Sequence, residues 1–162
     1  MQSETPWEPD STEQVIRRYS SMVYRLAFAR LGNRYDADEV FQEVFLRYVK
    51  KASGFTGEEH LKAWMIRVTI NCSKKLKNSP WRLKTQPLRE DLAFEETQNA
   101  DLYRELQRLP EKYREVIHLF YYESMSLEEM SRVLNRKNGT LRTQLTRARA
   151  MLREFMREED YV

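Results

Sequence analysis

Arginine, lysine and threonine side chains are concentrated in the stretch NRKNGTLRTQLTRARAML, residues 135–152, which contains no acidic residue. Guanidinium groups bind phosphate oxygens, and they also form paired hydrogen bonds with the O6 and N7 atoms of guanine. Small threonine side chains let a helix lie deep in the major groove of duplex DNA. The residue types therefore indicate nucleic-acid recognition.

A helix over this stretch separates its apolar side chains from its cationic ones. At 3.6 residues per turn, one face collects Leu141, Leu145, Ala148, Leu152 and Phe155, with Met156 just outside it. The opposite face carries Thr143, Thr146, Arg147 and Ala150, and one flank carries Arg142, Arg149 and Arg153. An ordinary amphipathic surface helix with solvated arginines fits the same pattern, so both alternatives stay open at this point.

The residues before this stretch predict the short helix and tight turn of a helix-turn-helix. Ser126 and Glu129 form a capping-box pattern at the start of a helix over 127–134. Asn135 can adopt the left-handed conformation that ends this helix, and the next helix is expected to start near 138–140. In a helix-turn-helix the second helix enters the major groove, and that helix here is the cationic one.

A second basic segment lies in the first half of the chain, where residues 62–89 contain eight lysines and arginines and no acid. A helix is predicted over 59–77, with an apolar stripe of Leu61, Trp64, Met65, Val68, Cys72 and Leu76. Arg67, Asn71 and Lys74 lie together on the far side, with Lys77 nearby. Trp64 and Cys72 are accordingly interpreted as core residues.

A further helix, predicted over 36–51, separates apolar from acidic residues. Its apolar stripe consists of Ala37, Val40, Phe41, Val44, Phe45 and Tyr48. Its opposite side carries Asp38, Glu39, Gln42 and Glu43. Acidic residues on a helix are usually just solvated, so the residue types alone do not assign a function to this face.

Apolar residues recur at helical spacing nearly everywhere in the chain, and glycine and proline are scarce. We expect an all-α protein of two small helical domains joined by a linker. Residues 1–12 are predicted as a flexible leader, 13–79 as the first domain, 80–100 as the linker and 101–162 as the second domain with the helix-turn-helix. Other helices are expected over 13–31, ended by Gly32, and over 101–109 and 111–122.

Composition excludes several classes of protein. No apolar run approaches the roughly 18–20 residues that span a bilayer, so we expect no membrane insertion. The single cysteine, Cys72, excludes an intrachain disulfide and fits the cytoplasm. His60 and His118 have no metal-ligand spacing with it, and no phosphate-binding glycine loop is present. We therefore expect no enzyme, no metal and no cofactor.

With these motifs in place, the chain resembles bacterial RNA polymerase sigma factors of the extracytoplasmic-function group. Residues 106–154 resemble the C-terminal domain of that family, with matching spacing at Leu109-Pro110, Arg114-Glu115-Val116, Glu129-Met130, Gly139-Thr140-Leu141 and Arg147-Ala148-Arg149. DADEVFQEVFLRYVKK resembles its core-binding helix, and AWMIRVTINCSKKLK resembles its promoter-melting helix. Three segments in the right order make the resemblance specific.

The resemblance implies a role for each of the three surfaces. It implies docking on core RNA polymerase through Asp38, Glu39, Gln42 and Glu43. It implies minus-ten recognition with Phe55 and Asn71 as base contacts and Arg67, Lys74, Lys75 and Lys77 as backbone contacts. For Phe55, a plug of the loop against the core is an equal alternative. It implies minus-thirty-five recognition through Arg142, Thr143, Thr146 and Arg147, with Lys137, Arg149 and the helix start around Thr140 at phosphates.

Some positions depart from the family pattern. The family usually has an apolar residue at Arg136, a serine cap at Lys137, a basic residue at Gln144 and often an acid at Lys75. We expect Arg136 to loosen the packing between the two helices of the motif. Because lysine cannot cap a helix, we expect Asn138 to take that role.

The resemblance also implies promoter DNA as a partner and an anti-sigma factor that covers these faces. In the family the linker threads toward the RNA exit path, so the acids between Glu90 and Glu96 either mimic nucleic acid there or are simply solvated. Two rival functions stay open: a stand-alone helix-turn-helix regulator that binds duplex DNA, usually as a dimer, and a helical adaptor that binds only protein.

Overall fold

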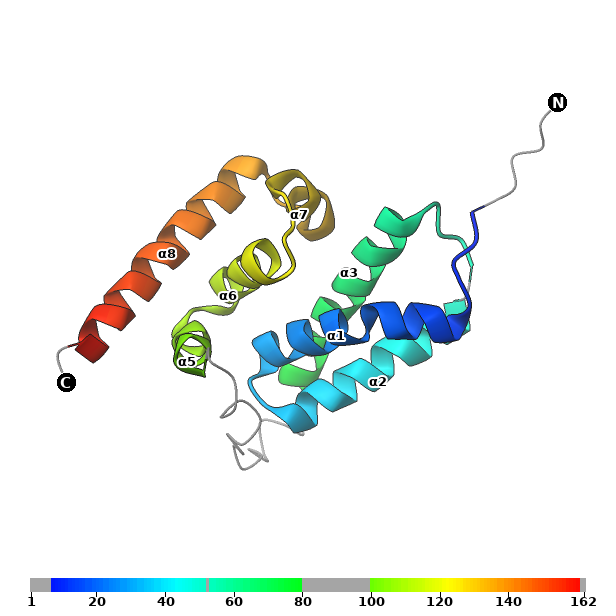
Figure 1. Ribbon diagram of the computed structural model, residues 1–162, viewed down its shortest axis with the longest axis horizontal. Coiled ribbons are helices and arrows are strands. Elements are labelled where there is room, and N and C mark those ends of the chain that lie inside the picture. The colour runs from blue at the N-terminus through cyan, green and yellow to red at the C-terminus, as the bar shows by residue number, and fades with distance from the viewer. Residues whose placement is uncertain (1–6, 52, 80–99, 161–162) are drawn as a thin grey trace.

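The computed structural model describes residues 7–51, 53–79 and 100–160, and every regular element within them is a helix (Figure 1). Helices α1 to α3 form an N-terminal lobe, and helices α5 to α8 form a C-terminal lobe. The predicted all-α fold with two helical parts is thus confirmed. The predicted linker and its acids lie outside the described residues, apart from Ala100.

The N-terminal lobe consists of α1 (Thr12–Leu31), α2 (Arg34–Lys51) and α3 (Glu58–Lys77), each packed on the other two. Ser11 and Gln14 form a capping box that starts α1. Gly32 ends α1 with a φ of 79°, as predicted, because only glycine adopts this left-handed conformation without strain. Trp7 packs against the lobe, and Asp10 forms an ion pair with Arg18. The flexible leader over residues 1–12 stays a prediction, and its residues 1–6 lie outside the described residues.

Helix α2 begins at Arg34, earlier than the predicted start at Asp36. The Asn33 side chain accepts a hydrogen bond from the backbone N–H of Asp36 at 2.8 Å, and it also donates to the Asp36 carboxylate at 2.8 Å. This exchange satisfies groups that a helix start otherwise leaves unpaired. Asparagine in the turn, rather than the aspartate, therefore sets the start of α2.

Helix α3 buries a wider face than the sequence predicts, because it packs against both α1 and α2. The additional buried residues are Ile66, Thr69, Ile70 and Ser73. The hydroxyls of Thr69 and Ser73 donate to the carbonyls four residues earlier at 2.7 Å, which removes the cost of burying them. Trp64 and Val68 of the predicted stripe are only partly buried and lie at its edge.

The C-terminal lobe consists of α5 (Ala100–Arg108), α6 (Glu111–Ile117), the π-helical segment η1 (His118–Tyr122), α7 (Leu127–Leu134) and α8 (Asn138–Asp160). These bounds agree with the prediction except that η1 replaces the expected continuation of one α-helix to Tyr122. Ser126 caps α7 by accepting from the Glu129 N–H at 3.1 Å, and Asn135 ends it with a φ of 54°. Both features of the predicted helix-turn-helix are therefore confirmed.

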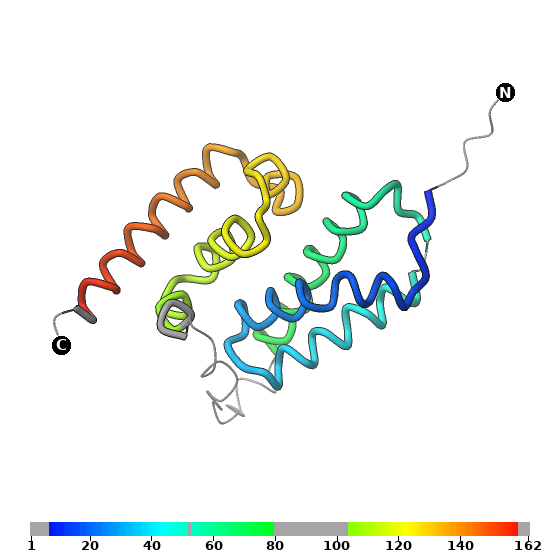
Figure 2. Tube along the Cα trace, in the orientation of Figure 1, coloured from blue at the N-terminus to red at the C-terminus, as the bar shows by residue number. Residues whose placement is uncertain are grey.

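The two lobes lie against each other, with α1 beside α6 and α3 beside α7, as the ribbon and the tube both show (Figures 1 and 2). Helix α8 lies on the side of the C-terminal lobe away from the N-terminal lobe (Figure 1). In the described ranges, no helix is long and apolar enough to cross a membrane, and no group of histidine, cysteine and acidic side chains is arranged to hold a metal ion.

Candidate nucleic-acid interface

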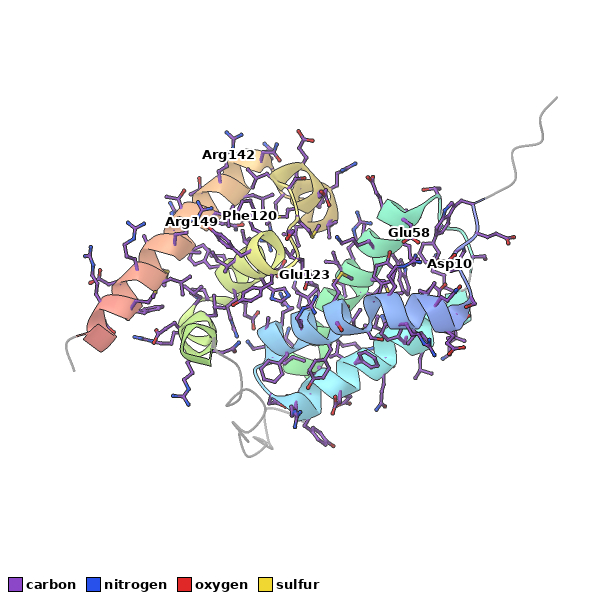
Figure 3. The ribbon with its side chains drawn as sticks, viewed as in Figure 1. Asp10, Glu58, Phe120, Glu123, Arg142 and Arg149 are labelled. Atoms are coloured by element: carbon purple, nitrogen blue, oxygen red, sulfur yellow. The ribbon has the colours of Figure 1, made fainter. Side chains whose placement is uncertain are left out.

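Helix α8 presents its cationic side chains to solvent, as the helical spacing of its residues predicts. Leu141, Leu145 and Ala148 are buried against the other helices of the lobe. The exposed set consists of Lys137, Thr140, Arg142, Thr143, Thr146, Arg147 and Arg149, and we call it the α8 basic face. Arg142 lies on the outer side of the helix (Figure 3). Within the described residues, the guanidinium groups of Arg142 and Arg147 form no ion pair, so they are available to an incoming phosphate or base.

The threonines of this face are oriented by their own helix. Thr143 Oγ1 donates to the Gly139 carbonyl at 3.0 Å, and Thr146 Oγ1 donates to the Arg142 carbonyl at 2.9 Å. Each hydroxyl thus keeps only its acceptor lone pairs for an external donor. Such a surface accepts hydrogen bonds from base amino groups and contacts the thymine methyl with its own methyl groups.

A hollow beside the start of α8 is lined in part by Lys112, a residue that we did not expect at this site from the sequence. Lys112 of α6 lines it together with Thr140, Thr143 and Arg147. Lys112 is exposed, and its Nζ lies 5.2 Å from the centre of the Tyr113 ring. The available signal was its place in the first turn of a helix directly after Pro110, but only the fold shows that this turn faces the start of α8.

Arg149 is held more tightly than its neighbours on this face. Its Nε donates to the Tyr121 hydroxyl at 2.6 Å, and its guanidinium lies 5.6 Å from the Phe120 ring and 5.4 Å from the Tyr121 ring (Figure 3). A guanidinium over aromatic rings is stabilised by their electrons and loses conformational freedom. Arg149 is therefore preoriented, whereas Arg142 and Arg147 are free to adjust.

Arg136 and Gln144, which we expected to depart from the family pattern, contact each other. Arg136 Nη1 donates to Gln144 Oε1 at 3.2 Å, and Arg136 Nη2 lies 3.3 Å from Glu115 Oε1. Our expectation that Arg136 loosens the motif is therefore wrong, because its guanidinium connects the turn to both α6 and α8. The expectation for Asn138 is also wrong: Asn138 is the first residue of α8, and the Lys137 carbonyl accepts the first helical hydrogen bond, from Leu141.

The predicted basic side of α3 is divided between solvent and the other lobe. Its residues are Arg67, Asn71, Lys74, Lys75 and Lys77, all exposed, and we call them the α3 basic face. The side chains of Asn71, Lys74 and Lys75 form no hydrogen bond or ion pair within the described part of the chain. Arg67 instead donates to the carbonyls of Val133 at 3.1 Å and Arg132 at 3.0 Å, and Lys77 pairs with Glu111. The structure thus brings α3 and the end of α7 together.

Phe55 is 4% exposed and fills the space under the loop between α2 and α3. Its ring packs against Tyr48 and Trp64, and Lys51 lies over it at 5.5 Å. Of the two alternatives for Phe55, the plug against the core is what the structure shows. A base contact by this ring stays a prediction, and it requires the ring to leave this packing.

Helix α2 has an acidic outer face with an apolar extension. Asp38, Glu39, Gln42 and Glu43 are all exposed, as predicted, and we call them the α2 acidic face. Leu46 and Val49 are 55% and 52% exposed, which we did not expect from the sequence. Their spacing of four and seven residues after Gln42 places them on the same side. An exposed apolar patch beside acids is typical of a protein-binding surface.

Two family models match the chain. The model of Sigma-70 region 2 matches residues 15–82, and the model of Sigma-70, region 4 matches residues 99–152. The first match contains the α2 acidic face and the α3 basic face. The second contains α6, α7 and the α8 basic face. Together the two models cover most of the chain.

Relatives of known name span the same regions. The chain is 28% identical over 159 residues to the ECF RNA polymerase sigma factor SigE of Mycolicibacterium smegmatis, which takes in 90% of this chain and 62% of that protein. It is 25% identical over 171 residues to the ECF RNA polymerase sigma factor SigW of Bacillus subtilis, which takes in 93% of this chain and 91% of that protein. The chain thus spans less than two thirds of the first relative and nearly all of the second.

Solved structures share the fold. The sigma factor RpoE in complex with the anti-sigma factor NepR from Bartonella quintana superposes with a TM-score of 0.73 at 19% identity, covering 90% of this chain and 96% of that one. CnrH in complex with the cytosolic domain of CnrY superposes with a TM-score of 0.69 at 22% identity, covering 91% and 88%.

Proposed function

Because the chain belongs to the sigma-70 family, we propose that it acts as an alternative sigma factor of the extracytoplasmic-function group. It binds core RNA polymerase and directs initiation at specific promoters. The observation that carries the proposal is that two separate lobes each present an exposed basic helix face, within the segments that match region 2 and region 4. Acting together in a holoenzyme, two such faces can contact two separated promoter elements.

The α8 basic face reads the minus-thirty-five element. Arg142 and Arg147 are the base-reading candidates because their guanidinium groups are exposed and unpaired within the described residues. Each good paired contact with guanine contributes about 1–3 kcal/mol of discrimination. Lys137, Lys112 and the preoriented Arg149 contact phosphates, which position the helix but do not select the sequence.

The α3 basic face holds the melted minus-ten element. Lys74 and Lys75 contact the sugar-phosphate backbone, and Asn71 contacts a base. Single strands bind to such surfaces through charge and stacking. Arg67 and Lys77 join this surface only when they leave the C-terminal lobe.

The α2 acidic face docks on core polymerase. Its carboxylates favour a cationic partner and raise the association rate, while Leu46 and Val49 supply apolar area that becomes buried on docking. RpoE is bound to the anti-sigma factor NepR in one of these structures, and CnrH is bound to the cytosolic domain of CnrY in the other. We therefore also propose that an inhibitory protein binds this chain at the same faces before it reaches polymerase.

The experiment that tests the proposal mixes the purified chain with core polymerase, with promoter duplex, and with both. We expect tight binding to polymerase, weak binding to the duplex alone, and promoter binding when all three are present. A tight footprint on duplex DNA without polymerase contradicts the sigma function and favours the stand-alone regulator. Absence of DNA binding even with polymerase favours the protein-binding adaptor.

A further inference from the structure

Arg30 carries a buried charge at the boundary between the lobes. It lies near the end of α1, is 4% exposed, and forms an ion pair with Glu115 of α6, which is 2% exposed. Glu111 of α6 lies 3.7 Å from the same guanidinium. A buried arginine is strongly unfavourable unless it is paired, so the N-terminal lobe depends on a carboxylate of the C-terminal lobe when the two are packed together.

Glu115 differs from Arg30 in having a second partner within its own lobe. Arg136 of the helix-turn-helix lies 3.3 Å from the Glu115 carboxylate and is itself held by Gln144. If the lobes separate, Glu115 keeps Arg136, and Arg30 becomes accessible to water. Arg30 Nε has no hydrogen-bond partner in the described structure, so water would satisfy a group that the packed state leaves unpaired. Both groups therefore tolerate separation.

Several of the contacts around this ion pair are polar. Gln107 and Arg114 each donate to the Ala29 carbonyl at 3.2 Å, and Arg25 lies 3.2 Å from Glu123. Arg67 donates to two carbonyls at the end of α7. Polar interfaces between domains exchange their hydrogen bonds with water and so open more readily than large apolar ones.

The packed arrangement uses residues of the α3 basic face. The guanidinium of Arg67 is exposed, but it is hydrogen-bonded to two carbonyls at the negative end of the α7 dipole, so a nucleic-acid phosphate must compete with those carbonyls for it. Lys77 is neutralised by Glu111. The C-terminal lobe therefore competes with a single strand for two of the cations that line α3.

We propose that the Arg30–Glu115 ion pair is a latch that holds the free chain closed, with Arg67 hydrogen-bonded to the end of α7, and that polymerase or promoter binding must release it. The closed state of the free chain does not depend on the proposed function. Its inhibition of polymerase binding does rest on that function. The latch links the turn of the helix-turn-helix, through Arg136 and Glu115, to α1.

The closed state is tested by measuring the distance between spin labels on Ser21→Cys and Ala150→Cys, one exposed position in each lobe. Cys72 is buried, and burial raises the pKa of its thiol, so it competes poorly for the label. We expect one narrow distance distribution in the unmodified background. Arg30→Gln and Glu115→Gln should each broaden it and shift it to longer distances.

Arg17→Gln is the matched control, because it removes an arginine from the same helix whose ion pair is with Glu13 in that helix. It should leave the distribution narrow. Arg67→Ala is a second opening variant that buries no unpaired charge, since Arg67 is exposed. Circular dichroism verifies that each variant is folded. A broad distribution in the background chain, or a narrow one in all three opening variants, overturns the latch.

Inhibition is tested separately, by titrating the unlabelled variants with core polymerase. If about a tenth of the free chain is open, full opening lowers the apparent dissociation constant about tenfold. We expect this gain for Arg30→Gln and Glu115→Gln but not for Arg17→Gln. Opening without a gain in affinity overturns the inhibitory role. If no variant binds polymerase, the proposed function fails, and the label distances still decide whether the latch exists.

Discussion

Arg136 in the turn of the helix-turn-helix donates to Gln144 of α8 and lies 3.3 Å from the carboxylate of Glu115 in α6. Glu115 is also the partner of Arg30 in the other lobe. Arg136 and Gln144, which we expected to depart from the family pattern, therefore belong to one network around a buried acid.

Replacing Arg136 should destabilise the C-terminal lobe. Arg136→Gln leaves the buried Glu115 with one charged partner fewer, and we expect the free energy of unfolding to fall by about 1–3 kcal/mol. Urea unfolding measures it. Arg153→Gln is the control, because Arg153 is exposed and without a partner in the described structure, and it should change stability by less than about 0.5 kcal/mol. Equal effects of the two substitutions contradict the role of the network.

Arg147→Ala should lower promoter selectivity. If the guanidinium reads a guanine, its loss should reduce discrimination at one base pair by about 1–3 kcal/mol, roughly tenfold to a hundredfold in relative initiation rate. Initiation assays with holoenzyme on a set of single-base promoter variants measure this. Lys137→Ala should instead weaken all promoters alike, since lysine contacts phosphate. A uniform loss with Arg147→Ala assigns this residue to the backbone as well.

Lys74→Ala should weaken promoter opening irrespective of sequence. Each lost phosphate contact also reduces the slope of log affinity against log salt by about 0.7–0.9. Permanganate footprinting of open complexes at several salt concentrations measures both effects. Arg17→Ala, which removes the same charge from a remote helix, should leave the slope unchanged. Loss that is confined to particular promoters is incompatible with a backbone contact.

Glu39→Lys on the α2 acidic face should weaken binding to core polymerase about tenfold or more, because it places a like charge against a cationic partner. Fluorescence anisotropy with labelled chain measures the affinity. Glu13→Lys reverses an exposed acid on α1 and should have little effect. If the two variants bind equally well, the docking face lies elsewhere.

Stability should fall in acid partly through Glu123. Burial alone raises the pKa of this carboxyl, but His118 and Arg25 outweigh it and lower the pKa below its ordinary value. A carboxylate whose pKa is lowered in the folded state stabilises the fold above its unfolded pKa of about 4.3, and this stabilisation is lost as pH falls through the lower folded pKa. Glu123→Gln should flatten the decline in unfolding free energy below about pH 4.5. Glu13→Gln should leave this decline unchanged. An unchanged decline in Glu123→Gln as well shows that the Glu123 carboxyl does not contribute to the loss of stability in acid.

The sequence predicts those features of the fold that depend on local spacing. Leu141, Leu145 and Ala148 are buried because helical periodicity places them on one side. Gly32 and Asn135 end their helices because glycine, which has no Cβ atom, and asparagine both tolerate a positive φ. The wider buried face of α3 could not be predicted in this way, since it depends on two neighbours packing against the same helix.

Arg30 is a residue whose burial the sequence indicates but whose partner it does not identify. It follows Val23, Leu26 and Ala27 at positions where the helical period calls for an apolar residue. A cation there indicates a buried acid somewhere in the fold. The acid is 85 residues away in the sequence, and no local pattern identifies it. The division of the α3 basic face between solvent and α7 was hidden for the same reason.

The most direct measurement is initiation in vitro by holoenzyme in which one basic face carries a reversed charge. Arg147→Glu on α8 and Lys74→Glu on α3 are the two variants, and Arg17→Glu on α1 is the control. We expect each of the two to abolish initiation while the chain still binds core polymerase, and we expect the control to initiate normally. Undiminished initiation with either variant contradicts this expectation.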